Sequence, residues 1–264
     1  MKLANVLVVL GTFWAILIWA ADPPAKPGIS LADGKFGKAL DARSAPAVLE
    51  GSARFGQTPL TVECWAKLNG KAKANVLLAN DAPASSSHWR LFTVAGTGEL
   101  RAMLAAGQPG EIRSQVDVCD GNWHHLALVH DGKSVKLHID GKLAVETAVE
   151  KKAASRSKIG ELSVGGLRDD KESLGCDGLI DDVRLSGTAR EIKEAPKAAL
   201  LHDPYTIVLW HFDKPEDFQV DPAWTPKPLT GNVPAWEKAT DKDWVDGRFR
   251  EMDTGLFLNA TFEH

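Results

Sequence analysis

The sequence predicts an all-β protein in which two antiparallel sheets pack face to face. Three observations lead to this fold class: short segments in which polar and apolar residues alternate, tight turns that contain glycine, and only one segment, residues 188–201, of helical character. Many short strands joined by regular turns are typical of a β-sandwich or barrel. The predicted helix is short and contains Pro196.

Residues 60–68 form the clearest predicted strand, because apolar and polar side chains alternate along it. One face, which we expect in the core, carries Leu60, Val62, Cys64, Ala66 and Leu68, and the opposite face carries Thr61, Glu63, Trp65 and Lys67. Further strands are expected at residues 89–94, 100–104, 123–130, 134–139, 143–149, 159–165 and 179–186. Asp131-Gly132 and Asp140-Gly141 mark two tight hairpin turns, since glycine accepts a positive φ at little cost.

The N-terminus predicts export. Lys2 precedes an almost wholly apolar run over residues 3–21, as in a secretory signal peptide. About 19 apolar residues can also just span a bilayer, so an uncleaved N-terminal anchor is the alternative. We expect a linker over residues 22–27, one large domain over residues 28–213 and a Pro/Trp-rich irregular tail over residues 214–264, with the start of a further module as the alternative for the tail. The net charge of −4 and the lack of a long basic run argue against a nucleic-acid partner.

Three cysteines follow the predicted signal or anchor segment: Cys64, Cys119 and Cys176. An oxidising compartment allows one disulfide, and the alternative is three buried free thiols. Cys119 and Cys176 each precede a predicted strand within a Cys-Asp-Gly phrase, so this pair is the expected bridge.

Five phrases resemble those of one family, in the family's order. They are Gly37–Asp41, Leu60–Lys67, Asp120–Ala127, Val135–Lys142 and Gly178–Leu185. Together they resemble laminin-G-like domains of the concanavalin A-like lectin/glucanase type, which occur in secreted bacterial proteins. The resemblance implies an antiparallel jelly roll over residues 28–213. Residues 206–213 also resemble an edge strand of that family.

The resemblance implies a recognition or structural module outside the cytoplasm, with a carbohydrate or an extracellular protein as its partner. The alternative is a glycan-active hydrolase or lyase of the same fold, which needs paired carboxylates on one strand. The sequence has no such phrase. Asp181 and Asp182 are the nearest acidic pair, and adjacent strand residues are expected to point to opposite faces.

Candidate site residues fall in three groups. The resemblance places an acidic position at Asp181 on the closing strand, and with Asp213 it forms a candidate structural Ca²⁺ site, since Ca²⁺ prefers carboxylate and carbonyl oxygens. Trp65 is a candidate for stacking on a sugar ring, with packing under a loop as the alternative. Residues 85–88 and 168–172 lie on connections, where sandwiches commonly carry function.

Overall fold

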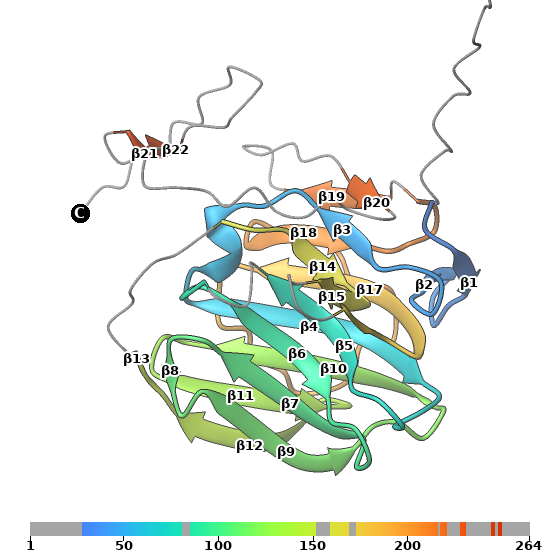
Figure 1. Ribbon diagram of the computed structural model, residues 1–264, viewed down its shortest axis with the longest axis horizontal. Coiled ribbons are helices and arrows are strands. Elements are labelled where there is room, and N and C mark those ends of the chain that lie inside the picture. The colour runs from blue at the N-terminus through green and yellow to red at the C-terminus, as the bar shows by residue number, and fades with distance from the viewer. Residues whose placement is uncertain are drawn as a thin grey trace, which may run out of the picture.

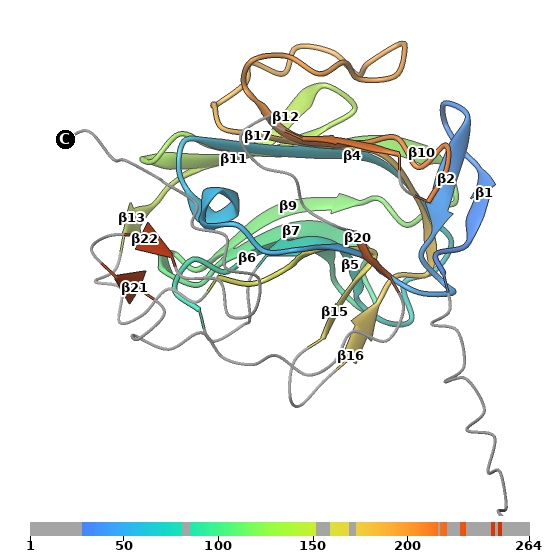
Figure 2. The same cartoon turned by 90° about the horizontal axis from the view of Figure 1, so that it is seen from above.

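Two antiparallel sheets pack face to face in the computed structural model, as Figures 1 and 2 show. The structure describes residues 28–80, 85–151, 159–168, 173–215, 217–220, 228–230, 244–245 and 248–249. The predicted signal or anchor and the predicted linker therefore lie outside the described residues. No helix within the described part of the chain has the length and apolar character needed to cross a bilayer.

The nine-stranded sheet, which we call sheet A, contains the strands that carry most of the polar chemistry. Its order is β1-β2-β17-β4-β10-β11-β12, and β18 pairs with both β17 and β19. The strands span Leu31–Asp33 (β1), Lys38–Asp41 (β2), Leu60–Leu68 (β4), Trp123–His130 (β10), Ser134–Ile139 (β11), Lys142–Ala148 (β12), Gly178–Ser186 (β17), Thr206–Trp210 (β18) and Phe218–Val220 (β19).

The seven-stranded sheet, sheet B, has the order β20-β3-β14-β5-β6-β7-β9. Its strands span Ala47–Leu49 (β3), Asn75–Asn80 (β5), Trp89–Thr93 (β6), Glu99–Leu104 (β7), Glu111–Asp117 (β9), Leu162–Val164 (β14) and Pro228–Thr230 (β20). Three short ladders complete the described strands: Gly107–Gln108 (β8) with Glu150–Lys151 (β13), Gly166–Arg168 (β15) with Ser173–Gly175 (β16), and Trp244–Val245 (β21) with Arg248–Phe249 (β22).

The predicted all-β sandwich is confirmed, and the core lies between the sheets. β4, β10 and β11 have the bounds that the sequence predicts. The predicted apolar face of β4, from Leu60 to Leu68, is buried in the main core with the apolar faces of both sheets. The two Asp-Gly turns join β10 to β11 and β11 to β12, with φ of 93° at Gly132 and 79° at Gly141.

The predicted helix over residues 188–201 is wrong. The segment has no helical structure, and the only helical turn among the described residues is the 3₁₀ turn Ala53–Gly56 (η1). Pro196 lacks the N–H that a helix needs at that position. In addition, the backbone N–H groups of Arg190 and Leu200 donate to side chains of sheet A. These bonds hold the segment across the sheet.

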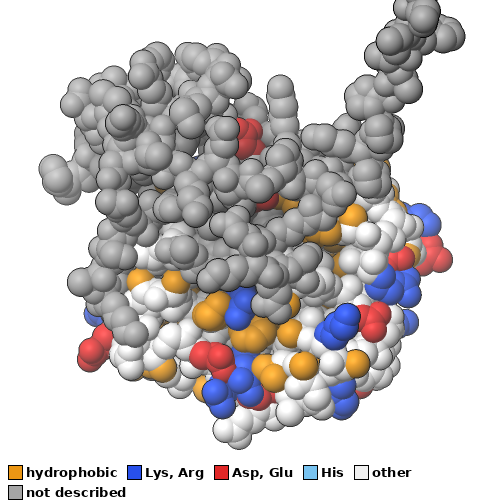
Figure 3. Space-filling model, in the orientation of Figure 1, with side chains coloured by type: hydrophobic (Ala, Val, Ile, Leu, Met, Phe, Trp, Pro, Cys, Tyr) orange, Lys and Arg blue, Asp and Glu red, His pale blue; other side chains and the backbone are white. Residues whose placement is uncertain are grey.

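The outer face of sheet B carries a second, smaller apolar cluster, and Figure 3 shows apolar side chains there among basic and acidic ones. Its buried members are Val76, Ala79, Phe92 and Leu167. The Arg90 guanidinium lies 4.7 Å from the centre of the Phe92 ring, within cation–π range. The described pieces of the C-terminal region add β19 to sheet A and β20 to sheet B.

Candidate functional site

Residues 187–205 cross the outer face of sheet A, and we call them the strap. Figure 2 shows this segment arching over the sheet that contains β4 and β17. Near its first end, the Thr61 hydroxyl donates to the Thr188 carbonyl (2.7 Å) and accepts the Arg190 N–H (2.9 Å). Near its second end, the Leu200 N–H donates to Asp182 Oδ2 (2.6 Å). The strap therefore closes the outer face of β4 to solvent.

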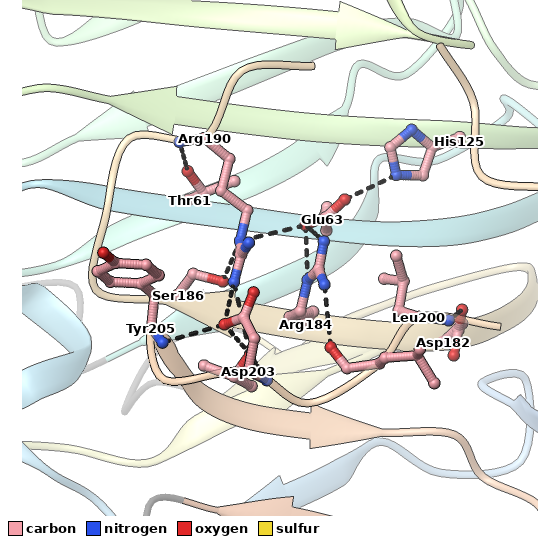
Figure 4. A network of polar contacts seen from close by, with 12 residues as sticks. Thr61, Glu63, His125, Asp182, Arg184, Ser186, Arg190, Leu200, Asp203 and Tyr205 are labelled. Carbon is pink, nitrogen blue, oxygen red and sulfur yellow. Dashed lines mark hydrogen bonds and ion pairs between the residues drawn. The ribbon is translucent and has the colours of Figure 1, made fainter. Parts of the chain in front are cut away.

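A buried ionic network lies under the strap, and Figure 4 shows it. Glu63 Oε1 accepts from Arg184 Nη2 at 2.7 Å, and Arg190 Nε lies 4.0 Å from the same oxygen. Glu63 Oε2 lies 3.1 Å from His125 Nε2. Burial alone would raise the pKa of Glu63, but the bond to His125 and the charge of Arg184 bring it below its usual value. Glu63 is thus an ionised structural anchor with no access to a substrate.

Trp65 is also covered. It is 5% exposed, and the Phe36 ring packs edge-on against it at 6.0 Å between ring centres. The Lys35 ammonium lies 4.4 Å from the centre of its ring. Because the tip of the β1–β2 hairpin occupies the indole face, Trp65 is not available in this structure as a stacking surface for a sugar. Trp65 therefore packs under a loop, which was the alternative to sugar stacking in the sequence-based prediction.

Asp181 and Asp182 lie in a β-bulge of β17, which the simple alternation of strand side chains did not anticipate. Asp182 has a φ of 53°. Both side chains are fully buried, and each binds a different segment. Asp181 Oδ2 accepts the N–H groups of Lys35 (2.7 Å) and Phe36 (2.9 Å), whereas Asp182 Oδ1 lies 2.5 Å from His211 Nδ1.

The predicted Ca²⁺ ligands Asp181 and Asp213 approach the same hairpin loop. Asp213 Oδ1 accepts the Lys38 N–H at 2.9 Å, beside the bonds of Asp181 to the loop. The buried Oδ1 of Asp181 has no hydrogen-bond partner among the described residues, so it is an acceptor that fits a cation. The described residues contain no group of three or more His, Cys, Asp or Glu side chains placed to hold a metal ion.

The predicted bridge between Cys119 and Cys176 is not formed. All three cysteines are buried free thiols. Both residues do precede strands that begin beside the same end of β4. The Asn75 amide, however, donates to Cys119 Sγ (3.5 Å) and accepts the Asp177 N–H (2.7 Å), so it binds next to both cysteines. Burial raises the pKa of the Cys64, Cys119 and Cys176 thiols, which keeps them protonated and unreactive.

A pocket of about 500 Å³ opens at the end of the sandwich where β4 and β6 begin and β7 and β10 end; we call it the end pocket. Its floor is apolar and buried and includes Leu60, Trp89 and Leu104. Polar residues around it are Gln57, Thr58, Ser86, Ser87, His88, His130 and Glu150. Small-molecule sites typically combine an apolar lining with a few placed polar groups in a volume of this order.

Neighbouring hydrogen bonds hold the end pocket in shape. The Trp89 indole N–H donates to the Phe55 carbonyl (2.6 Å), which fixes the ring. Ser85 and Ser87 hydroxyls lie 2.8 Å apart, and His130 Nδ1 lies 3.0 Å from the Ser134 carbonyl. The predicted functional connection over residues 85–88 thus contributes to this pocket. Of the other predicted connection, Arg168 ends β15, and residues 169–172 lie outside the described part of the chain.

A shallower depression of about 650 Å³ lies between the hairpin tip and the middle of the strap. It is lined by Lys35, Phe36, Glu194, Ala195, Pro196 and Lys197. It is wide open, and its Glu194 and Lys197 side chains pair with each other at 2.8 Å. The end pocket is the better candidate site, because its floor is buried and its polar residues come from several loops.

The sandwich has relatives among known proteins. Mouse neurexin-2 is 28% identical over 175 residues, which cover 66% of this chain and 9% of neurexin-2. The chain thus matches only a small part of that relative. Domain 4 of an extracellular arabinanase from Geobacillus stearothermophilus, solved with arabinotriose, is 19% identical with a TM-score of 0.44; the match covers 60% of this chain and 75% of that domain.

A SAP-like pentraxin from Limulus polyphemus is 15% identical with a TM-score of 0.46. The match covers 78% of this chain and 92% of the pentraxin. A sequence model described as "Concanavalin A-like lectin/glucanases superfamily", of the laminin-G type, matches residues 41–195, more than half of the chain. The chain therefore belongs to the concanavalin A-like lectin/glucanase superfamily.

Proposed function

We propose that this chain is a non-catalytic carbohydrate-binding module and that the end pocket is its binding site. The observation that carries the proposal is the pocket itself: an apolar lining that includes the exposed Ala53 and Ala105 and the buried Trp89 and Leu104, surrounded by hydroxyl, amide and imidazole groups, at one end of a lectin-type sandwich. A pyranose or furanose ring has apolar C–H faces and a circumference of hydroxyl groups. It therefore matches such a lining, because each hydroxyl needs a hydrogen-bond partner when it leaves water.

The carboxylates support binding rather than catalysis. Glycoside hydrolysis needs two carboxyl groups on either side of the scissile bond. The described residues around the end pocket include a single carboxylate, Glu150. Glu63 is buried among cations, and Asp181 and Asp182 bind backbone N–H groups of the hairpin and the strap. Each of these three carboxylates already serves the fold.

We further propose that the module works outside the cytoplasm, released after cleavage or anchored through residues 3–21, and that Ca²⁺ stabilises it. The apolar run at the N-terminus supports the first proposal. The buried, unpartnered Oδ1 of Asp181 and the nearby Asp213 support the second. These two residues would hold the ion against the β1–β2 hairpin, far from the end pocket along β17.

A glycan array followed by isothermal titration tests the binding site. The variant A105W places a large ring at the exposed Ala105, which lines the end pocket, and Q57A removes an exposed amide from it. The control A198W places the same ring at an exposed alanine of the strap. We expect wild type and A198W to bind the same glycan, A105W to lose binding and Q57A to bind more weakly.

A reducing-sugar assay on the same material separates a binding module from an enzyme. If wild type releases reducing sugar from the glycan and A105W does not, the pocket is catalytic. That result would contradict the non-catalytic proposal. Equal glycan binding by wild type and A105W would place the site elsewhere. If wild type binds no glycan on the array, carbohydrate recognition by this chain is rejected.

A further inference from the structure

Tyr205 stands out among the exposed apolar side chains. It is the only tyrosine in the chain, and it is 62% exposed. Isolated apolar side chains on a surface need no special explanation. Tyr205 differs from such residues in two respects: its backbone is held rigidly, and it lies at the same end of the sandwich as the end pocket.

The turn that carries Tyr205 lies at the end of the strap and is fixed by bonds to the start of the strap and to β18, as Figure 4 shows. Asp203 Oδ1 accepts the Tyr205 N–H (3.0 Å) and binds Arg190 Nη2 (2.7 Å). The Thr206 N–H donates to the Asp203 carbonyl (2.9 Å), and the Tyr205 carbonyl accepts from the Gly187 N–H (2.9 Å). The bond to Arg190 brings the pKa of the Asp203 carboxyl well below its usual range, so this anchor stays charged.

The strand register places this turn near the end pocket. Leu60 lines the pocket and pairs with His130, which also lines it. The next residue of β4, Thr61, pairs with Ser186, and Ser186 pairs with Thr206. Tyr205 precedes Thr206, so it lies two strand positions from β4 at the same end of sheet A. Neighbouring strands are about 4.8 Å apart, which puts the backbone of the turn roughly 10 Å along the sheet from Leu60, the pocket residue on β4, and one strand farther from His130 on β10.

We propose that Tyr205 stacks on a sugar residue one or more positions along a glycan chain whose end occupies the end pocket. The preferred ligand is then an oligosaccharide or polysaccharide chain, and not a free monosaccharide. This inference rests on the proposed function and specifies the ligand class of the same site. A tyrosine ring suits the role because it offers a large contact surface and loses only two side-chain torsions when it becomes ordered.

The test is the dependence of affinity on chain length. Titrations use arabino-, xylo-, manno- and cello-oligosaccharides of increasing length against wild type, Y205A, Y205F and the control L143A. Leu143 is also exposed, at 52%, but it lies on β12 at the opposite edge of sheet A. We expect wild type, Y205F and L143A to gain affinity with length, and Y205A to lose roughly five- to tenfold on long chains while binding short ones unchanged.

Three results would overturn the inference. If Y205A keeps the full gain of affinity with chain length, Tyr205 is no subsite, although the end pocket can still bind sugars. If Y205A weakens short and long chains equally, Tyr205 acts on the fold of the pocket. If wild type binds none of these sugars, this inference fails; if A105W binds them as well as wild type does, the proposed site fails and this inference fails with it.

Discussion

Replacement of Asp181 by asparagine should stabilise the protein at high pH and leave it unchanged at low pH, in the absence of divalent cations. Asp181 is fully buried, and burial raises its pKa to about 7 despite the N–H groups of Phe36 and Lys35. The charge of Asp182 adds to this effect. In D181N an amide oxygen can still accept both N–H bonds, but no negative charge has to be buried.

The direction of the pH dependence follows from proton binding. Between pH 4 and pH 7 the folded protein keeps a proton on Asp181 that the unfolded chain has released, so its stability falls as the pH rises through this window. The difference between the usual pKa of 3.8 and about 7 corresponds to about 4 kcal/mol of unfolding free energy, as an upper bound. For a domain of this size, that is a shift of about 10 °C in melting temperature.

Urea unfolding followed by tryptophan fluorescence between pH 4.5 and 8.5, with EDTA present, measures the effect. The control is D213N, because Asp213 is exposed and its charge is already hydrated. We expect D181N to match wild type at pH 4.5 and to exceed it at pH 8.5, whereas D213N follows the wild-type curve. Two results would refute the argument that burial of the Asp181 charge destabilises the protein at high pH. One is a free energy of unfolding of wild type that does not fall between pH 4.5 and 8.5, and the other is an equal fall in D181N.

Three further predictions concern the ion, the network and the strap. Ca²⁺ should raise the melting temperature of wild type at pH 8 and not that of D181N; equal shifts in both would exclude Asp181 as a ligand. E63A should lower the free energy of unfolding by about 3–5 kcal/mol, because the Arg184 guanidinium, whose side chain is only 13% exposed, loses its carboxylate partner. A loss below about 1 kcal/mol in chemical denaturation would contradict this. G141A should destabilise more than G121A: both positions have a positive φ, but a Cβ at Gly141 would lie 2.3 Å from the Glu194 Cα, whereas Gly121 has open space. Thermal unfolding of the two variants side by side checks this, and equal losses would show that the strap does not rest on that turn.

Local sequence pattern sufficed for the parts of the fold that depend on one strand and its neighbour. The alternation in β4 and the Asp-Gly turns after β10 and β11 set strand bounds and register, because they depend on side-chain period and backbone φ alone. The same alternation misled on the outer face of β4. Glu63 and Trp65 are as polar or amphipathic as surface residues. Their burial depends on partners from distant segments, among them Arg184 and Phe36, which the alternation does not reveal.

Side chains that act across long sequence distances account for the other differences. A bulge in β17 breaks the alternation at Asp181 and Asp182, and no residue type marks it. The bridge predicted between Cys119 and Cys176 is not formed, and the Asn75 amide binds Cys119 Sγ and the backbone N–H next to Cys176. The end pocket was partly predictable, since the Ser-rich connection before Trp89 was identified as a functional loop. Its other walls come from chain segments that meet only in the folded protein.

The strap limits which surfaces of this sandwich are open to solvent. A sheet face offers a broad platform only while it is open, and here the strap and the β1–β2 hairpin cover Glu63 and Trp65 on sheet A. Opening that face would leave Arg184 and Glu63 without strap contacts and would break the bonds of Thr61 and Asp182 to the strap backbone. Each such loss costs about 1 kcal/mol or more. The same bonds fix the Tyr205 turn, so the contacts that close the sheet face also place an aromatic ring at the end of the sandwich, where the end pocket remains open.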